Sequence, residues 1–307
     1  MLIILSHSAR AGTAPARWKQ IEPAIRSRVR DDIEVTNLDD HTEHLLRDRV
    51  RSGEHRIVAA GGDGTVNAVL QMIMHLPTGL RKRVTLGTIG LGSSNDTHKP
   101  WQAHSLVSDV PVMMDFEHAA ARDVGVIRYR DGERTRTRYW MLNASVGVTA
   151  DANRFFNHGD FLLHILKRSV TSLAILYAAL RSILLGGRRD LLIERDSGDA
   201  VTIGINNLAI LKSPHVSGGL RYDVPLNPAS GTFHVHCFSG AARMQVLGLL
   251  CALIWGEASA LKHADGWEGS RLRLHSDSDF CVEFDGETIC TREALLTIHP
   301  HRIRVAS

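Results

Sequence analysis

The sequence predicts an α/β fold joined to a β-rich one: an N-terminal domain with a parallel sheet, then a larger, antiparallel, β-sandwich-like domain with inserted helices. The first 115 residues alternate short apolar runs with stretches of helical spacing, and this order is typical of a parallel sheet. After about residue 120 the apolar runs are short and bounded by turn residues, which favours antiparallel pairing. We therefore expect domains at 1–118 and 119–291, and the last segment, about 292–307, could return to the first domain.

The first domain is expected to contain four strands buried on both faces, because each run is almost wholly apolar and short. Three helices are expected between these strands, since apolar residues there recur at helical spacing. The predicted strands are 2–5, 32–35, 56–60 and 84–89, and the predicted helices are 14–29, 41–52 and 65–76.

The second domain is expected to consist of short strands, which two helical segments interrupt at about 158–186 and 241–261. Residues Leu162, Leu166, Leu173 and Leu180 fall on one stripe of the first segment, as in an amphipathic helix. The predicted strands are 121–130, 137–148, 190–196, 200–211, 232–240, 270–276, 280–287 and 295–305.

Composition excludes disordered and collagen-like proteins. The 307 residues are 44% hydrophobic and 22% charged, as in ordinary folded proteins. The formal net charge of +3 is spread along the chain, and the densest basic stretch, 128–138, also contains acidic residues. We therefore expect a solvated strand or hairpin there and no nucleic-acid partner.

The cysteines and the apolar stretches predict a cytoplasmic protein. Cys237, Cys251, Cys281 and Cys290 have no CxxC spacing, so we expect buried free thiols in a reducing compartment and neither a zinc site nor a disulfide framework. The N-terminus is apolar for only five residues and lacks a basic region, unlike a signal peptide. The longest apolar stretches are well short of the ~20 residues that span a bilayer.

A glycine-rich turn follows the third predicted strand, in the sequence VAAGGDGTVNAVL (58–70). Glycines let a ligand approach backbone N–H groups, and the start of the following helix favours an anion. Asp63 would repel phosphate unless Mg²⁺ or hydrogen-bond donors lie between them, which indicates a nucleotide that binds with its metal. The alternative is a tight turn that Asp63 and Thr65 cap.

A second glycine loop follows the fourth predicted strand, in LGTIGLGSSNDTHK (86–99). Loops at the carboxyl ends of neighbouring parallel strands converge on one crevice. Two polar, glycine-bearing loops at that edge make a nucleotide site the better hypothesis.

Taken together, GGDGTVNAVL, LGSSND and, near the C-terminus, VEFDGE resemble the diacylglycerol kinase catalytic-domain family. Soluble bacterial lipid kinases belong to this family, sphingosine and ceramide kinases are relatives, and the wider superfamily shares the GGDG loop with NAD kinases and phosphofructokinases. The resemblance extends over nearly the whole chain. It implies a two-domain kinase that transfers the γ-phosphate of ATP, bound with Mg²⁺, to a lipid hydroxyl.

The resemblance also implies site residues. Glu287 matches the residue proposed to accept the proton of the lipid hydroxyl, with Asp285 two positions before it, and Asp63 is included among the catalytic candidates. Ser93 replaces a usual threonine, and Thr36 matches a nucleotide-contacting threonine in a loose alignment. The nucleotide-binding candidates are Gly61, Gly62, Asp63, Gly64, Thr65, Val66, Ser93, Asn95, Asp96 and Thr36.

The chemistry of phosphoryl transfer independently asks for a carboxylate that orients the alcohol or accepts its proton. In CVEFDGE the acidic residues Glu283, Asp285 and Glu287 alternate with apolar ones, so all three would share one face if the strand continued. The turn expected at Asp285-Gly286 could redirect Glu287.

Three departures from the family leave a second hypothesis open. The usual Asn-Pro-x-Ser-Gly stretch is SHSARAG here, and the second loop has Ser-Ser where Gly-Thr is typical. Bacterial members hold a structural Mg²⁺ in an Asp-Gly-x-x-Asp hairpin, but here Ser230 and His234 occupy those aspartate positions. Mg²⁺ prefers carboxylate oxygens, so we expect no metal ligands there. The chain could thus be a non-catalytic lipid- or nucleotide-binding protein.

A lipid acceptor requires an apolar cleft and peripheral contact with a membrane surface. The two helical segments are the candidates for both. A kinase of a soluble acceptor, such as an NAD kinase, is a third hypothesis, and an exposed strand edge could form a homodimer. The residues that could line the cleft or meet headgroups are Phe155, Phe156, Phe161, Leu162, Ile165, Trp255, Lys167, Arg168, Arg188 and Arg189.

Overall fold

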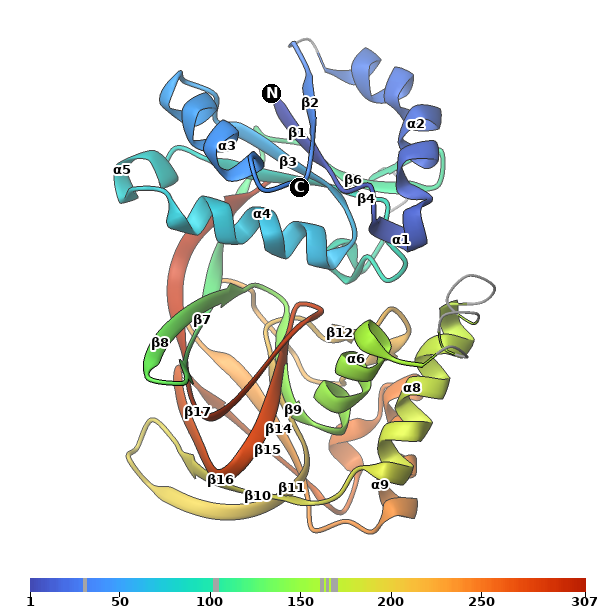
Figure 1. Cartoon of the computed structure of the whole chain (residues 1–307), viewed down its shortest axis with the longest axis vertical. Helices are drawn as coiled ribbons and strands as arrows, with labels where there is room; N and C mark the ends of the chain where they lie inside the picture. The colour runs from blue at the N-terminus through green and yellow to red at the C-terminus, as the bar shows by residue number, and fades with distance from the viewer. Residues whose placement is uncertain (30–31, 102–104, 161–162, 164–165, 167–170) are drawn as a thin grey trace. The chain divides into compact units, whose positions relative to one another are not determined.

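A parallel sheet forms the centre of the first of two units into which the chain divides (Figure 1). The structure is a computed structural model that describes residues 1–29, 32–101, 105–160, 163, 166 and 171–307. Unit 1 comprises Met1–Arg122 and His301–Ser307, and unit 2 comprises Asp123–Pro300. We expected the boundary at 118/119 and the return from about 292.

The parallel strands of unit 1 are β1 (Leu2–Leu5), β2 (Glu34–Asn37), β3 (Arg56–Gly61) and β4 (Thr85–Gly90), in the order β2-β1-β3-β4. The antiparallel β6 (Val110–Met113) and the parallel end of β17 (Glu287–Val305) both pair with β4. The expectation that all four strands are buried on both faces was wrong for β2. That strand forms the edge of the sheet, and its residues are half-buried or exposed.

Helices cover both faces of this sheet (Figure 1). On one face, Trp18 and Ile25 of α2 (Ala14–Arg28) pack in one cluster with Ile3 and Val58. The alternating residues of the strands point to the other face, where α3 (Thr42–Arg51) contacts β1 and α4 (Asp63–His75) contacts β3. Shorter elements are α1 (Ala9–Gly12), α5 (Thr78–Arg81), the 3₁₀ turn η1 (Asp96–His98) and β5 (Leu106–Val107).

Antiparallel strands enclose the core of unit 2, in which Trp140, Phe233, Phe280 and Phe284 are buried. The predicted strand 137–148 is two strands, and the predicted strands 270–276 and 280–287 are one strand with an irregularity after His275. The strands are β7 (Ala120–Asp131), β8 (Arg134–Trp140), β9 (Asn143–Gly147), β10 (Arg189–Glu194), β11 (Ala200–Leu211), β14 (Phe233–Ser239), β15 (Ala264–Gly269), β16 (Arg271–Phe284) and β17, with the short pair β12 (His215–Val216) and β13 (Leu220–Arg221).

Helices pack on the outer side of β11 and β14. Ile183 of α8 (Thr171–Leu185) and Leu249 of α9 (Arg243–Trp255) share a cluster with Leu211 and Phe238. An additional helix, α6 (Val148–His158), follows the strand predicted at 137–148, and it packs against α8. The 3₁₀ turn η3 (Ala258–Ala260) follows α9. Within the described part of the chain, no helix is both long and apolar enough to cross a membrane.

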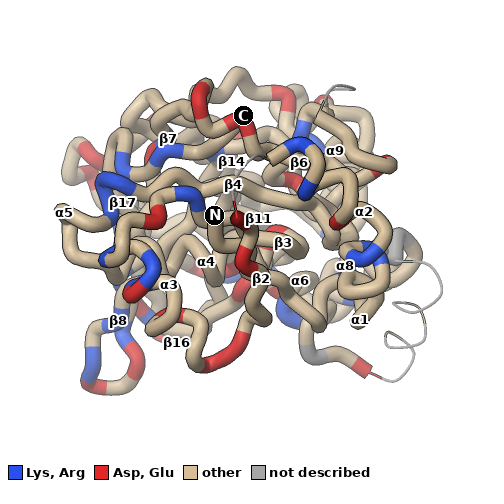
Figure 2. The backbone as a smooth tube through the Cα atoms, turned by 90° about the horizontal axis from the view of Figure 1, so that it is seen from above, with Lys and Arg blue, Asp and Glu red and all other residues tan. Residues whose placement is uncertain are grey.

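Basic and acidic residues lie side by side along β7 and β8 (Figure 2). The Arg136 guanidinium, for example, lies 2.6 Å from the Asp131 carboxylate. This hairpin therefore presents mixed charge to the solvent.

The expectation of four free thiols was wrong for one pair, because Cys281 and Cys290 form a disulfide. These residues lie directly opposite each other in the β16–β17 hairpin, with Cα atoms 4.0 Å apart. Cys237 is a buried free thiol and Cys251 an exposed one. The pairing could not be deduced from spacing, because it depends on the hairpin register.

Gly125 of β7 is expected to be essential for the packing of Trp140 in unit 2. A Cβ atom at Gly125 would lie 1.9 Å from Trp140 Cε2 on the neighbouring strand. We expect Gly125→Ala to lower the free energy of unfolding by about 1–3 kcal/mol, as overpacking in a core does. Urea unfolding measures this change, and Gly219→Ala in unit 2 is the comparison, because an added Cβ there would meet no atom within 4 Å and the backbone does not have positive φ. Equal effects of both substitutions would contradict the packing argument.

Candidate functional site

The two glycine loops meet at the carboxyl edge of the sheet in unit 1. Gly61 and Gly90 are register partners, and the Gly61 carbonyl accepts hydrogen bonds from Leu91 N (2.9 Å) and Gly92 N (3.1 Å). A Cβ atom at Gly92 would lie 2.3 Å from Gly62 Cα. The loops thus need glycine partly to pack against each other, a reason that sequence spacing did not show.

The Asp63 carboxylate joins the two loops. It accepts hydrogen bonds from Asp96 N (3.0 Å), Thr97 N (2.9 Å) and Thr97 Oγ1 (2.8 Å). These three donors use most of the acceptor capacity of one carboxylate. Asp63 is therefore a positioning residue for the second loop.

Asn95 folds the second loop back on itself. Its backbone is left-handed at φ 51°, a conformation that Asn tolerates. Its side-chain amide donates to the carbonyls of Gly90 and Gly92, and its Oδ1 accepts from Gly92 N. The adjacent Asp96 carboxylate pairs with Lys99 Nζ at 2.7 Å.

The amino end of α4 opens at this edge. Gly62 precedes the helix with extended backbone, and among the described residues no side-chain cap is found there. Such an end presents N–H groups and partial positive charge to an anion. Gly64 lies in the first turn, and the N–H groups of Thr65 and Val66 bond to the Gly62 carbonyl.

The structure brings together most of the predicted nucleotide-binding residues but leaves Thr36 apart. Thr36 lies at the carboxyl end of the edge strand β2, so β1 and β3 separate it from β4 and the loop with exposed Ser93. The loop after β1 carries three consecutive left-handed residues, Arg10, Ala11 and Gly12. Sequence reasoning did not find this strained turn, which replaces the usual glycine-containing stretch of the family.

In unit 2, the predicted turn forms at Asp285-Gly286. Both residues have positive φ, as a two-residue type I′ hairpin requires. The buried Asp285 carboxylate accepts hydrogen bonds from the backbone N–H groups of Met141 (2.7 Å), Leu142 (2.9 Å) and Asn143 (3.1 Å). Asp285 therefore positions the β8–β9 connection and does not present its carboxylate to a substrate, as a catalytic role would need.

The three carboxylates of this strand do not share a face, because the turn ends β16 at Phe284. Glu283 accepts from Ser145 Oγ (2.8 Å) and Gly286 N (2.9 Å). Glu287, the first residue of β17, is exposed. The side chains of Asn153 and Asn157 on α6 donate to the Gly286 carbonyl at 2.8 and 3.0 Å. The turn is thus fixed from both sides, and Glu287 projects from it.

A buried polar group beside this turn was missed from the sequence. Asn207 Oδ1 accepts from Thr149 N and Oγ1, and Asn207 Nδ2 donates to Tyr222 Oη. Burial raises the pKa of Tyr222, and the nearby Glu283 carboxylate raises it further. The signal available in the sequence was a polar Asn-Asn pair inside the apolar strand 200–211.

The structural Mg²⁺ that the family implies does not fit unit 2. The 227–232 hairpin does converge oxygen atoms, but they surround the Lys212 ammonium. Lys212 Nζ lies 2.7 Å from Asp123 Oδ2, 2.9 Å from the Asn227 carbonyl, 3.2 Å from Ser230 Oγ and 2.6 Å from the Thr232 carbonyl. Lys212 and Asp123 are both buried, so a cation already fills this position.

Only part of the predicted lipid cleft can be placed. Phe155 and Phe156 pack against the α8 cluster, and Trp255 is 75% exposed. Arg189 pairs with Asp151 at 2.9 Å, and Arg188 lies 3.6 Å from Asp190. Phe161, Leu162, Ile165, Lys167 and Arg168 lie outside the described residues.

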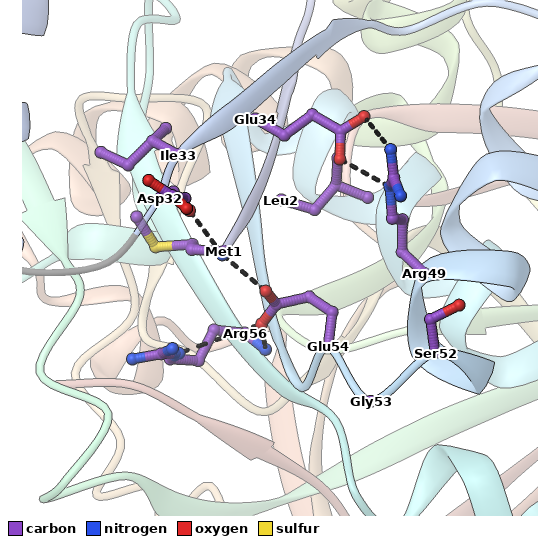
Figure 3. Close-up of a pocket in the computed structure, with 10 residues that line it drawn as sticks. All are labelled: Met1, Leu2, Asp32, Ile33, Glu34, Arg49, Ser52, Gly53, Glu54 and Arg56. Carbon is purple, nitrogen blue, oxygen red and sulfur yellow. Dashed lines mark hydrogen bonds and ion pairs between the residues drawn. The ribbon is translucent and has the colours of Figure 1, made fainter.

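A cavity of about 650 Å³ in unit 1 lies at the opposite edge of the sheet from the glycine loops (Figure 3). Its charged groups neutralise one another. Arg49 Nε lies 2.6 Å from Glu34 Oε2, and the Met1 amine lies 2.5 Å from Glu54 Oε2. We therefore do not include this cavity in the candidate site.

His98, near the end of the second loop, is buried as a neutral imidazole. Its Nε2 lies 3.0 Å from Thr88 Oγ1, and its buried Nδ1 has no partner among the described residues. Burial lowers the pKa of His98 to about 4, although the Asp63 charge acts in the opposite direction. Acidification should therefore destabilise the part of unit 1 that holds the second loop.

We expect stability to depend on His98 between pH 6.5 and 4. Over this range the unfolded state binds a proton that the folded state excludes, so the free energy of unfolding falls as the pH falls. From pH 7 to pH 5 the loss from this group is about 2 kcal/mol. Urea unfolding at both pH values should show a smaller loss for His98→Gln than for wild type. The exposed-site control His7→Gln should match wild type, and identical losses for all three would contradict the prediction.

Comparison with known proteins identifies the N-terminal part of the chain. Residues 1–125 match the model of the family described as diacylglycerol kinase catalytic domain. A protein of Xanthomonas oryzae pv. oryzae (strain MAFF 311018) named "Probable lipid kinase YegS-like" is 37% identical over 85 residues, 27% of this chain and 28% of that protein. A relative of the same name from Xanthomonas euvesicatoria pv. vesicatoria (strain 85-10) is 37% identical over 65 residues, 21% of each chain. The matched stretches therefore span less than a third of these relatives.

Solved structures match the whole chain. Two structures of candidate diacylglycerol kinases from Bacillus anthracis str. Sterne have TM-scores of 0.72 and 0.71, and the match covers 99% of this chain and 94% and 96% of theirs. The sequence identities are 16% and 14%, so this likeness concerns the fold. The resemblance predicted from the motifs is confirmed for the N-terminal part of the chain, since residues 1–125 match the model of the diacylglycerol kinase catalytic domain family.

Proposed function

We propose that the protein is an ATP-dependent lipid kinase that transfers the γ-phosphate to the hydroxyl of a diacylglycerol- or sphingoid-type lipid. The observation that carries this proposal is the pair of glycine loops, which Asp63 joins beside the uncapped start of α4. These loops lie inside the segment that matches the catalytic-domain family. The names of the relatives support a lipid acceptor.

The nucleotide would bind at the carboxyl edge of the unit 1 sheet. Gly62 offers a close approach, and the N–H groups at the start of α4 favour phosphate oxygens. Ser93 is exposed on the second loop, and its hydroxyl could donate a hydrogen bond to the nucleotide. Mg²⁺ would arrive with ATP and neutralise phosphate charge. Asp63 and Asn95 would act by holding the second loop in place.

Glu287 is the residue that we assign as general base. Its carboxylate would take the proton of the lipid hydroxyl while that oxygen bonds to the γ-phosphorus and the bond to the β,γ-bridging oxygen breaks, releasing ADP. The turn at Asp285-Gly286 fixes the backbone of Glu287 and leaves its side chain exposed.

Two alternatives predict different results. A non-catalytic lipid- or nucleotide-binding protein would bind ATP without turnover, and the strained turn at Arg10–Gly12 is the feature that favours it. An NAD kinase-like enzyme would phosphorylate a soluble acceptor without detergent. We favour the lipid acceptor, and with it a cytoplasmic protein in phospholipid metabolism that contacts the membrane peripherally. A homodimer remains a further proposal.

Transfer of radiolabelled γ-phosphate from ATP-Mg²⁺ into mixed micelles tests the proposed function. The acceptors are diacylglycerol, sphingosine, ceramide and monoacylglycerol. We expect Glu287→Gln to lower kcat by about 10²–10⁴-fold, as loss of a general base does, with little change in ATP binding. Glu133→Gln, in the exposed β7–β8 turn, is the matched control and should keep wild-type activity.

Two results would count against this assignment. Near wild-type kcat in Glu287→Gln would remove Glu287 as the base. The absence of label in every lipid, while ATP still raises the Tm, would favour the non-catalytic alternative.

A further inference from the structure

The outward faces of α8 and α9 in unit 2 are apolar along their length. On α8, Leu173, Leu176, Leu184 and Leu185 are exposed, the last to 68%. On α9, Met244, Ile254 and Trp255 are exposed to 76%, 53% and 75%. These seven residues, which we call the α8–α9 face, lie on two helices that contact each other, and large exposed apolar surfaces of soluble proteins often mark interaction sites.

The fold of unit 2 does not need these side chains. The opposite sides of the same helices supply the packing, since Ile183 of α8 lies in one cluster with Val246, Leu249 and Leu253 of α9. A helix that is apolar on all sides yet lies at the protein surface suggests a second apolar environment. The exposed residues are therefore available to a partner.

The charge of the two helices indicates which partner. Neither helix contains an acidic residue, and their only charged residues are Arg181 and Arg243. Arg188 and Arg189, which follow α8 after two glycines, pair with Asp190 and Asp151, so the basic charge of this face comes from the helices themselves. An apolar face whose charges are all basic complements a bilayer with anionic headgroups. Trp255, at the end of α9, is of the residue type that favours the interface between headgroups and acyl chains.

We propose that the α8–α9 face docks on an anionic lipid bilayer and inserts its exposed leucines and Trp255 at the headgroup boundary. This partner rests on the proposed function, because a lipid kinase must collect its acceptor from a membrane. Docking itself requires no phosphoryl transfer, so the two proposals can fail separately.

Sedimentation with phosphatidylcholine vesicles, with and without phosphatidylglycerol, tests the docking. We expect wild type to bind the anionic vesicles more tightly than the neutral ones, and Trp255→Gln to weaken vesicle binding about tenfold or more. Trp101→Gln is the matched control, because Trp101 is a comparably exposed tryptophan in unit 1 (56%). The pair Leu184→Gln and Leu185→Gln provides a second, independent variant if Trp255→Gln does not fold.

The outcomes separate docking from catalysis. Equal vesicle binding by Trp255→Gln and Trp101→Gln would overturn the docking proposal, as would a dimer that Trp255→Gln dissociates while no protein binds vesicles. Vesicle binding without label transfer in micelles would leave docking intact and contradict the kinase. Label transfer without vesicle binding would support the kinase and overturn the docking proposal.

The oxygen atoms around Lys212 in unit 2 support a second inference, which concerns the structural Mg²⁺ that does not fit this unit. Lys212 follows β11 directly, and its ammonium reaches four oxygen atoms from β7 and the 227–232 hairpin. Asp123 Oδ2 also accepts from Gly231 N at 2.7 Å, and Asp123 N donates to the Pro228 carbonyl. These contacts fix the hairpin to the start of β7 around one buried charge.

The same lysine is connected to the turn that carries Glu287. Lys212 N donates to the Leu142 carbonyl at 2.8 Å, and the N–H of Leu142 donates to Asp285. We infer that the Lys212 ammonium is a permanent internal cation that takes the structural role of a divalent metal in unit 2. The packing of the 227–232 hairpin should therefore be independent of Mg²⁺.

Thermal unfolding with excess EDTA or with Mg²⁺ tests this inference without reference to activity. We expect the wild-type Tm to change by no more than about 1 °C in either condition, because no ion binds the folded state at this position. Lys212→Met should lower the Tm by about 10 °C, since it removes the cation that neutralises the buried Asp123 carboxylate. Lys262→Met, at an exposed position of unit 2, is the matched control and should behave as wild type.

A double variant keeps the test decisive if Lys212→Met does not fold. Lys212→Ser with Ser230→Asp removes the ammonium and adds a second carboxylate, so its Tm should rise with Mg²⁺. A wild-type Tm that EDTA lowers would overturn the inference. Equal Tm values for Lys212→Met and Lys262→Met would do so as well.

Discussion

The carboxylate of Asp63 is the constraint on which the candidate nucleotide site depends. It binds backbone and hydroxyl donors of Asp96 and Thr97 and so holds the second glycine loop against the first. Unit 2 uses the same device, because Asp285 binds three consecutive N–H groups at the β8–β9 connection. Buried carboxylates pay for their desolvation through such charge-assisted hydrogen bonds. In both units an aspartate fixes a loop that would otherwise lack regular pairing.

This arrangement divides the acidic residues of the proposed site by role. Asp63 and Asp285 have their oxygen atoms occupied by protein donors, and Glu283 bonds to Ser145 and Gly286. Glu287 is exposed at the end of the Asp285-Gly286 turn. A base that must accept a proton from a substrate needs such an open carboxylate on a fixed backbone. Exposure and hydrogen bonding, rather than residue type, distinguish the proposed base from the positioning residues.

The buried Lys212 ammonium in unit 2 holds the 227–232 hairpin, as the two aspartates hold their loops. Lys212 neutralises Asp123 and donates to the Asn227 and Thr232 carbonyls of the hairpin. A lysine supplies one charge and three donors, whereas Mg²⁺ requires closer oxygen ligands in a fixed geometry. The loss of acidic residues at Ser230 and His234 is therefore compatible with an ordered hairpin. Like Asp285, Lys212 contacts the 141–143 segment, so the cation and the turn with Glu287 belong to one hydrogen-bonded network.

The sequence by itself determined the order and type of most elements, because apolar periodicity and turn residues are local signals. It also located both glycine loops and the Asp285-Gly286 turn, since glycine and Asp-Gly have backbone preferences that need no tertiary context. Only the tertiary structure decided what each polar side chain bonds to. The cage of Lys212, the amide contacts of Asp63 and Asp285, and the Cys281–Cys290 pairing all join residues far apart or depend on strand register. Such contacts arise from the packing of the folded chain, which no local pattern encodes.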